Sequence, residues 1–376
     1  MKVLLVGEYS GVHTNLKKGL EKFGVDVLLI SEGDAWKKFN SDILLYCPEN
    51  TKWKKYYNRL MIQKCCNWAK DADVVQFINP SCLYIVNKKF TGVAFELMKR
   101  AKVSVSVLAG CDCGMADYQE RIIPYICPTC LQEMKKRNWT CFIKSDAAYR
   151  KYEEAFYKRI DCLVPGEWAC YKVYHDYVKK YNRKMTRIIP YPIDCNAIHP
   201  VYNQHDKIVV HFPLNAAKKG TLVVKKAFGI LRKKYRDRLL LEVRGHMPIE
   251  KYLEYLNGID IIVDGVGGYS CGLGMSCLMA MAKGKAAVGV RDQVEEGDRS
   301  KWLLESPQVD PGYGEDGIVK AVESIISDPE RLYELQKESR EFVKKYFDAP
   351  LVAKQYIKLY KQLLDRKNAQ KIRQNK

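Results

Sequence analysis

The sequence predicts an α/β protein made of two doubly wound domains, each with a parallel sheet between layers of helices. Its 376 residues are too many for one core of ordinary size and fit two domains. Short apolar, β-branched runs alternate with helical patterns in both halves of the chain. Residues 258–290 also have the pattern of a strand, a glycine-rich loop, a helix and a second strand in immediate succession.

The first domain is expected over residues 1–191. Its opening run, 2–7, has the composition of a buried strand, and a helical pattern at 13–23 and a second strand pattern at 25–30 follow it directly. Further strands are predicted at 74–78, 103–108, 162–164 and 188–189, and further helices at 83–100 and 168–181.

The second domain is expected over residues 207–344, after a linker at 191–206 that contains two prolines and few periodic positions. Its strands are predicted at 207–211, 239–244, 261–264 and 286–290, and its helices at 222–235 and 275–283. A helical pattern then runs through residues 329–364.

The loop before the helix at 275–283 contains Gly265, Gly267, Gly268, Gly272 and Gly274. Glycines let the backbone approach a ligand, and the unpaired N–H groups at a helix N-terminus attract an anion. Together with the phrase Pro-Tyr-Pro-Ile-Asp at 190–194, this arrangement resembles GT-B glycosyltransferases, particularly the retaining enzymes of family 4.

The resemblance implies two Rossmann-like domains that face each other across a cleft. The N-terminal domain would bind the acceptor and the C-terminal domain the nucleotide-sugar donor, with a last helix at about 345–365 that packs back onto the first domain. The implied reaction transfers a sugar to an acceptor hydroxyl with retention of configuration, as a hexosyltransferase does. It needs no cofactor for catalysis.

The sequence departs from the family at two positions. The family carries a pair of glutamates that contact the donor sugar and the ribose, and alignment on Gly272 and Gly274 places Cys271 and Met279 there. Neither side chain can accept two hydroxyl hydrogen bonds as a carboxylate does. Two alternatives therefore stay open: a non-catalytic glycosyltransferase-like binding protein, and a nucleotide-sugar epimerase of the same fold.

Lys219, directly before Gly220 at the start of a predicted helix, matches the family's lysine on the leaving diphosphate. The family's neighbouring arginine is missing, and Arg244 could replace it. A solvated surface lysine is the ordinary alternative for Lys219. The predicted donor-binding residues are Gly11, Asn215, Lys219, Arg244, Gly245, Ser270, Gly272, Gly274 and Met275.

Two residues that follow predicted strands are candidates for catalysis. His13 lies in the loop after the first strand, where it could donate to the donor or the acceptor, or could cap its helix. Asp112 could orient an acceptor hydroxyl, or could be an ordinary turn residue.

Four of the 14 cysteines form a C-x-C pair, Cys111 and Cys113, followed by a C-x-x-C pair, Cys127 and Cys130. This spacing predicts a structural zinc site, because four thiolates leave no open position for catalysis. Buried thiols and a redox pair are the alternatives. The N-terminus has no signal-peptide pattern, so we expect a cytoplasmic protein with reduced cysteines.

The formal charge of +19 indicates an anionic partner. No motif of the common nucleic-acid modules is present, which disfavours nucleic acid. Basic residues are concentrated at 179–187 and 366–376, so we expect attraction to an anionic membrane surface, where a glycan or lipid-linked acceptor for surface polysaccharide or glycolipid synthesis would be found. A solvated basic surface is the alternative.

Overall fold

The computed structural model describes residues 1–122, 141–167, 170–171, 173–174, 184–202, 206–214, 220–266, 273–291 and 304–374. The chain forms two compact units. Unit 1 contains Met1–Ala116, Phe142–Pro192 and Ala349–Lys376, and unit 2 contains Asp117–Cys141 and Ile193–Asp348. The junction at Pro192 lies next to the predicted end of the first domain at residue 191.

Unit 1 is built on a seven-stranded parallel sheet in the order β3-β2-β1-β4-β5-β6-β7. Its central strands are buried on both faces, as a parallel sheet between helices requires. The strands are β1 (Lys2–Val6), β2 (Asp26–Ser31), β3 (Ile43–Leu44), β4 (Val74–Phe77), β5 (Val103–Leu108), β6 (Cys162–Pro165) and β7 (Lys184–Met185).

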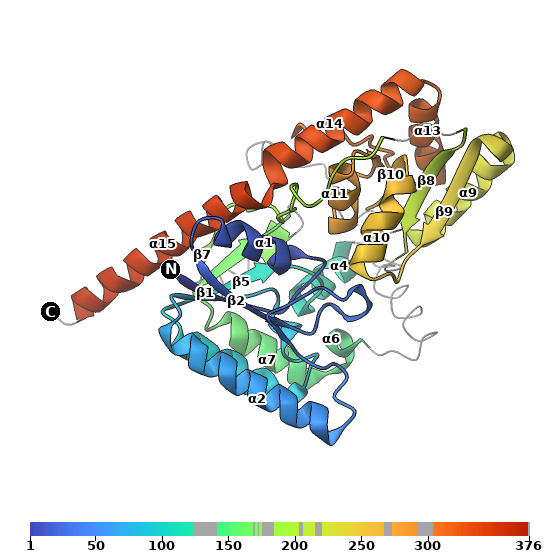
Figure 1. Ribbon diagram of the computed structural model, residues 1–376. Coiled ribbons are helices and arrows are strands. Elements are labelled where there is room, and N and C mark those ends of the chain that lie inside the picture. The colour runs from blue at the N-terminus through green and yellow to red at the C-terminus, as the bar shows by residue number, and fades with distance from the viewer. Residues whose placement is uncertain are drawn as a thin grey trace. The chain divides into compact units, whose positions relative to one another are not determined.

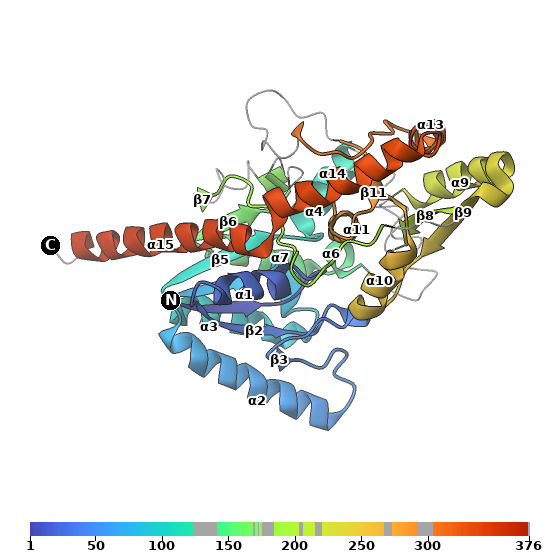
Figure 2. The same cartoon turned by 45° about the horizontal axis from the view of Figure 1, so that its top comes forward.

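Helices cover both faces of this sheet. In both views α1 and α15 lie on one side of the sheet and α2 lies on the other (Figure 1, Figure 2). Helix α3 packs against α2 and α7. The helices of unit 1 are α1 (Val12–Glu21), α2 (Lys52–Trp68), α3 (Thr91–Arg100), α6 (Phe142–Ser145), α7 (Ala147–Tyr157) and α15 (Ala349–Gln374), and α4 (Cys113–Ile122) begins in unit 1 and ends among residues of unit 2.

Two predicted elements of unit 1 are wrong in extent. The strand expected at 188–189 lies earlier in the chain, as β7. Beyond β7, only two single hydrogen bonds continue the ladder beside β6, from Thr186 N to Leu163 O and from Ile189 N to Pro165 O. The helix expected at 83–100 begins only at Thr91. Asn87 accepts a hydrogen bond from Lys89 N and starts a short 3₁₀ turn before it.

Unit 2 is built on a four-stranded parallel sheet in the order β11-β10-β8-β9. One hydrophobic core joins this sheet to α9 and α13, with Phe212, Phe228, Ile261 and Val322 among its buried members. The strands are β8 (Ile208–Pro213), β9 (Leu239–Arg244), β10 (Ile261–Val263) and β11 (Ala286–Val288), and the helices are α9 (Thr221–Tyr235), α10 (Ile249–Tyr255), α11 (Met275–Ala282), α13 (Glu315–Ile326) and α14 (Pro329–Phe347).

The helical pattern at 329–364 forms two helices, and the second of them begins close to the last helix expected at about 345–365. The chain leaves the helical conformation at Asp348 (ψ 131°), which separates α14 from α15. Pro350 explains the break, since inside a continuous helix its ring would clash with the carbonyl group four residues earlier. In the first turn of a new helix, proline removes no helical hydrogen bond.

Within unit 1, α15 packs closely against α1 at Gly19. A Cβ atom on Gly19 would lie 2.3 Å from the carbonyl oxygen of Ala349 and 2.9 Å from the Cβ atom of Ala353. The absence of a side chain therefore sets the distance between the two helices.

We predict that Gly19→Ala destabilises unit 1 by about 1–3 kcal/mol, because backbone atoms of α15 must move to admit the methyl group. Gly92→Ala is the matched control in α3, where an added Cβ meets nothing within 4 Å and should be neutral or stabilising. Calorimetric unfolding of the two variants makes the comparison. Equal melting temperatures would show that α15 does not hold this close contact.

Candidate functional site

The strand orders locate one candidate site in each unit. Ligands of open α/β sheets bind at the carboxyl ends of the strands, where the strand order reverses. In unit 1 the order reverses between β1 and β4, and in unit 2 it reverses between β8 and β10. The loops that follow these four strands are therefore the places to examine.

In unit 1 the loop after β1 packs directly on the loop after β4. Gly7 has a φ of 83°, and a Cβ atom there would lie 2.4 Å from the Cβ atom of Cys82 and 2.5 Å from a methyl carbon of Ile78. The hydroxyl of Tyr9 lies 2.7 Å from that of Ser81. These contacts fix the backbone at the reversal point.

The side chain of Glu8 occupies the N-terminus of α1. Its carboxylate accepts hydrogen bonds from Gly11 N (2.8 Å), Thr14 N (2.6 Å) and Thr14 Oγ1 (2.6 Å). Burial raises the pKa of Glu8 to about 7, although these hydrogen bonds act in the opposite direction. A helix N-terminus that attracts anions is thus already filled by an internal carboxyl group.

The structure therefore does not support the prediction that Gly11 binds the donor. Its N–H donates to Glu8, and its Cα lies so close to the ring of Phe39 that an added Cβ would be 2.8 Å from a ring carbon. The sequence shows the glycine, but the carboxylate that satisfies its N–H is recognised only in the folded loop.

The structure does not support the prediction that His13 contacts substrate. It is fully buried, with Nδ1 at 2.8 Å from Gly7 O and Nε2 at 3.2 Å from the Nε2 atom of Gln76. A carbonyl only accepts and an amide nitrogen only donates, so His13 is the neutral tautomer with its proton on Nδ1. Burial lowers its pKa to about 3, and both ring nitrogens serve the interior.

Asp112 is also corrected, because its carboxylate lies inside the domain. It accepts hydrogen bonds from Met115 N (2.9 Å) at the start of α4, from the hydroxyl of Tyr157 (2.6 Å) and from the hydroxyl of Tyr174. Burial raises its pKa. It is a buried cap and tyrosine partner and does not face an acceptor.

Polar residues that the sequence analysis did not select lie beside the loop after β1. Asp34 accepts from Ser10 N (2.7 Å) and forms an ion pair with Lys37 (2.5 Å), and Lys37 also donates to Ser10 Oγ (2.8 Å). Burial, followed by repulsion from Asp34, raises the pKa of Glu32 to about 7. These half-buried groups can bind hydroxyl groups of a sugar, since each offers donors or acceptors at the sheet edge.

In unit 2, Arg244 ends β9 and Gly245 follows it, at the same edge as the end of β8. Leu214 N donates to Arg244 O (2.7 Å), and a Cβ atom on Gly245 would lie 2.1 Å from Leu214 O. Gly245 is therefore required for the approach of the two loops. Its predicted ligand contact stays a prediction.

The guanidinium group of Arg244 is half exposed and has a defined orientation. Its Nη2 donates to Glu242 Oε1 (2.9 Å), and its centre lies 5.3 Å from the ring centre of Tyr255. The Tyr255 hydroxyl donates to the other oxygen of Glu242 and lies 3.1 Å from Nδ1 of His211. The remaining donors of Arg244 are thereby held at the sheet edge, as a phosphate-binding arginine requires.

The N-terminus of α11 follows the end of β10. Gly274 is its N-cap residue and has no side chain with which to cap the helix, and Met275 begins the first turn. All eight residues of α11 are buried, including Met279. The helix is therefore a core element, and the N–H groups of its first turn are the part that can bind an anion.

Several predicted site residues lie outside the described residues. They are Asn215, Lys219, Ser270, Cys271, Gly272, Cys127 and Cys130.

The remaining two candidate zinc ligands lie beside Asp112. Cys111 is half-buried, and the buried Cys113 donates from its thiol to Ile143 O (3.7 Å). Burial, followed by the Glu153 carboxylate, raises the pKa of the Cys113 thiol, so only a cation would hold it as a thiolate. Within the described ranges no group of three or more His, Cys, Asp and Glu side chains is arranged to hold a metal.

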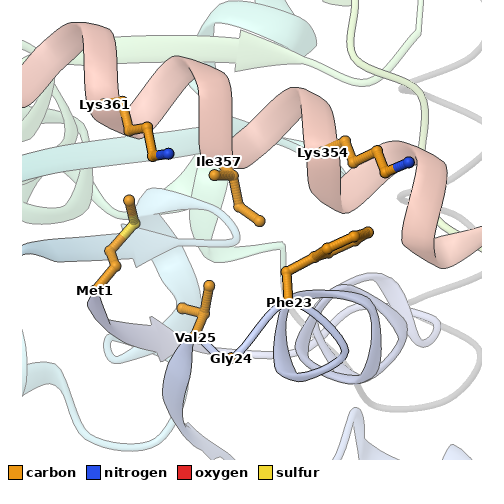
Figure 3. Close-up of a pocket in the computed structure, with 7 residues that line it drawn as sticks. All are labelled: Met1, Phe23, Gly24, Val25, Lys354, Ile357 and Lys361. Carbon is orange, nitrogen blue, oxygen red and sulfur yellow. The ribbon is translucent and has the colours of Figure 1, made fainter.

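A pocket of about 420 Å³ in unit 1 lies at the opposite end of the sheet (Figure 3). Met1 and Val25 precede β1 and β2, so the pocket is at the amino ends of the strands and away from the reversal point. We therefore do not assign sugar transfer to it. Its lining residues are Met1, Phe23, Gly24, Val25, Lys354, Ile357 and Lys361.

No helix in the part of the chain that the structure describes is long and apolar enough to cross a membrane.

We predict that Glu8→Gln changes how the stability of the protein depends on pH. A raised carboxyl pKa means that the folded state binds the proton more tightly, so this stabilisation is complete below pH 4.5 and is lost as the pH rises through 7. The wild type should lose on the order of 3 kcal/mol relative to Glu8→Gln over that range.

Denaturant unfolding of both proteins from pH 4.5 to pH 7 measures this difference. His13 and Glu32 titrate in both proteins, so most of their contribution cancels. A stability difference that is constant across the range would show that Glu8 does not titrate there.

No protein-family model and no curated protein sequence matches the chain. Solved structures do. Sucrose-phosphate synthase from Thermosynechococcus elongatus has a TM-score of 0.62 at 15% identity, over 97% of this chain and 100% of that chain. The catalytic domain of starch synthase IV from Arabidopsis thaliana, bound to ADP and acarbose, has a TM-score of 0.60 at 11% identity, over 97% and 99%. Anabaena HepE in complex with UDP-glucose has a TM-score of 0.58 at 12% identity, over 96% and 100%. The chain has the GT-B fold, with two Rossmann-like domains.

Proposed function

We propose that this protein is a glycosyltransferase that moves a sugar from a nucleotide-sugar donor to an acceptor hydroxyl. The observation that carries the proposal is the N-terminus of α11, which follows β10 next to the order reversal of a GT-B donor sheet. Similar structures contain UDP-glucose or ADP, which agrees with a nucleotide-sugar donor.

In the proposed reaction the bond between the donor sugar and the diphosphate breaks, and a bond from the acceptor oxygen to the same sugar carbon forms. The diphosphate gains negative charge as it leaves. Lys219, Arg244 and the N–H groups at the start of α11 would stabilise that charge. Asn215, Ser270 and Gly272 belong to the same proposed donor site.

The two sequence-predicted catalytic residues are buried, so neither His13 nor Asp112 is proposed as the base that takes the acceptor proton. We propose that a donor phosphate oxygen takes the proton, which leads to retention of configuration in a hexosyl transfer. The half-buried group of Ser10, Glu32, Asp34 and Lys37 would bind the acceptor. A glycan or lipid-linked chain for surface polysaccharide or glycolipid is the proposed acceptor class.

A non-catalytic binding protein is the second candidate, and Met279 favours it. Its buried thioether cannot bind ribose hydroxyls as a glutamate does. Saturable binding of a nucleotide distinguishes the two candidates, because a degenerate donor site would show none.

We predict that Lys219→Ala lowers kcat/KM by roughly 10²-fold, because the charge it neutralises grows as the donor bond breaks. The donor is first found by thermal-shift screening of nucleotides and nucleotide sugars, since a ligand that binds the folded protein raises its melting temperature. Steady-state kinetics with that donor then compare the wild type and the variant.

Lys225→Ala is the matched control, since this exposed lysine lies on α9 a few residues away. It should keep wild-type kinetics. If Lys219→Ala folds and keeps the wild-type kcat/KM, Lys219 is not part of the site. If no nucleotide or nucleotide sugar of the panel binds, the result favours the non-catalytic binding protein.

We also propose a structural zinc held by Cys111, Cys113, Cys127 and Cys130. The C-x-C and C-x-x-C spacing supports it, and Cys111 and Cys113 lie two residues apart at the start of α4. One zinc per chain is expected from elemental analysis of protein purified without chelator, and Cys127→Ser should release it. A zinc content near zero, with four freely titrating thiols, would show that these cysteines only pack in the fold.

A further inference from the structure

The helix α2 (Lys52–Trp68) of unit 1 has one face fixed against the domain. Asn58, Ile62, Cys65 and Cys66 form its buried face. The side chain of Asn58 donates to Tyr46 O (2.9 Å) and accepts from Tyr46 N (2.9 Å). This pair of bonds sets the rotation of the helix about its axis, so the opposite face is held towards solvent.

That outer face carries a stripe of large apolar side chains. Trp53, Tyr56 and Leu60 recur at spacings of three and four residues, which places them on one side of the helix. They are 58%, 63% and 46% exposed. Trp53 also stacks on Tyr57 (5.6 Å between ring centres) and meets Tyr46 edge-on (5.2 Å), so its ring is supported in the exposed position.

The charge of α2 has a single sign. Its sequence, KWKKYYNRLMIQKCCNW, contains five basic residues and no acidic residue. In the described parts of the chain, no carboxylate lies within 4.0 Å of Lys52, Lys55, Arg59 or Lys64. Exposed apolar residues occur singly on most proteins, but here a contiguous aromatic stripe lies between unpaired positive charges.

We propose that α2 is a membrane-contact helix, whose Trp53–Tyr56–Leu60 stripe enters the interface of an anionic bilayer while its lysines and arginine bind lipid phosphates. Tryptophan and tyrosine favour the headgroup level of a bilayer, and an amphipathic helix with a basic flank lies in that plane. The charge complementarity selects anionic lipid as the occupant. The proposal does not depend on the sugar chemistry.

This location differs from the segments expected from sequence. Residues 175–183 lie outside the described residues. At the end of α15 the exposed bases accompany only one large exposed apolar side chain, Ile372, and Lys367 is paired with Asp161 (3.2 Å). Charge alone attracts a protein to a membrane. Among the described helices, only α2 combines basic side chains with an exposed aromatic stripe.

Helix α9 of unit 2 provides a matched control. It exposes Leu222 and Ile230 together with Lys225, Lys226 and Lys233, but no exposed aromatic side chain. If general basicity caused membrane binding, changes on α9 would matter as much as changes on α2.

The test is co-sedimentation of the full chain with phosphatidylcholine vesicles that contain phosphatidylglycerol, and with vesicles of phosphatidylcholine alone. We expect binding to the anionic vesicles that weakens at high salt. Trp53→Ala/Tyr56→Ala/Leu60→Ala should lower the partition coefficient by roughly tenfold or more. Each charge removed in Lys52→Gln/Lys55→Gln/Arg59→Gln should lower it about fivefold.

Leu222→Ala/Ile230→Ala and Lys225→Gln/Lys226→Gln should leave the partition coefficient unchanged. Brominated lipids should quench wild-type fluorescence more than that of Trp53→Phe, which places Trp53 at the bilayer. Because all altered side chains of α2 are exposed, unchanged thermal unfolding is expected and is checked for each variant.

Equal binding to neutral and anionic vesicles, or equal losses from the α9 and α2 variants, would overturn the proposal. So would binding of a single-stranded oligonucleotide that displaces the vesicles and is lost in the α2 variants, which would assign the surface to nucleic acid. Dimers in sedimentation velocity that disappear in the triple variant would assign it to a second copy of the chain.

Discussion

A chain of buried hydrogen bonds holds the functional end of unit 1. Tyr360 of α15 donates to Gln76 Oε1 (2.7 Å), Gln76 donates from its amide nitrogen to His13 Nε2 (3.2 Å), and His13 Nδ1 donates to Gly7 O (2.8 Å). The chain connects the last helix of the protein to the loop after the first strand. Loss of one member leaves buried polar atoms unpaired, which costs more than the bond itself contributes.

The loop that this network supports also contains its own anion. Glu8 satisfies the N–H groups at the start of α1, so a phosphate would have to displace a buried carboxyl group. In unit 2 the N-cap residue of α11 is Gly274, which has no side chain with which to cap the helix. The N-cap residues of α1 and α11 are thus both glycines, but at α1 the carboxyl group of Glu8 accepts from the first N–H groups.

Most strands of both sheets could be predicted because short β-branched or apolar runs alternate with helical patterns, and the predicted bounds of β5 and β9 agree with the structure. The short edge strand β3 was not predicted, and β7 lies ahead of the strand expected at 188–189. The roles of single polar residues could not be predicted from the sequence. His13 and Asp112 follow strands, as catalytic residues do, but their hydrogen-bond partners Gln76 and Tyr157 are distant in sequence. Helix α2 was missed because its exposed stripe of Trp53, Tyr56 and Leu60 obscures the period of its buried face.

Arg244 is held in a defined orientation at the sheet edge of unit 2. An arginine binds phosphate well only when its fork is oriented, and here Glu242, Tyr255 and His211 form a connected set of contacts beneath it. Because Gly245 brings this loop against Leu214 at the end of β8, the arginine lies at the sheet edge where the donor phosphates are proposed to bind, although it comes from a different loop than in the resembled family.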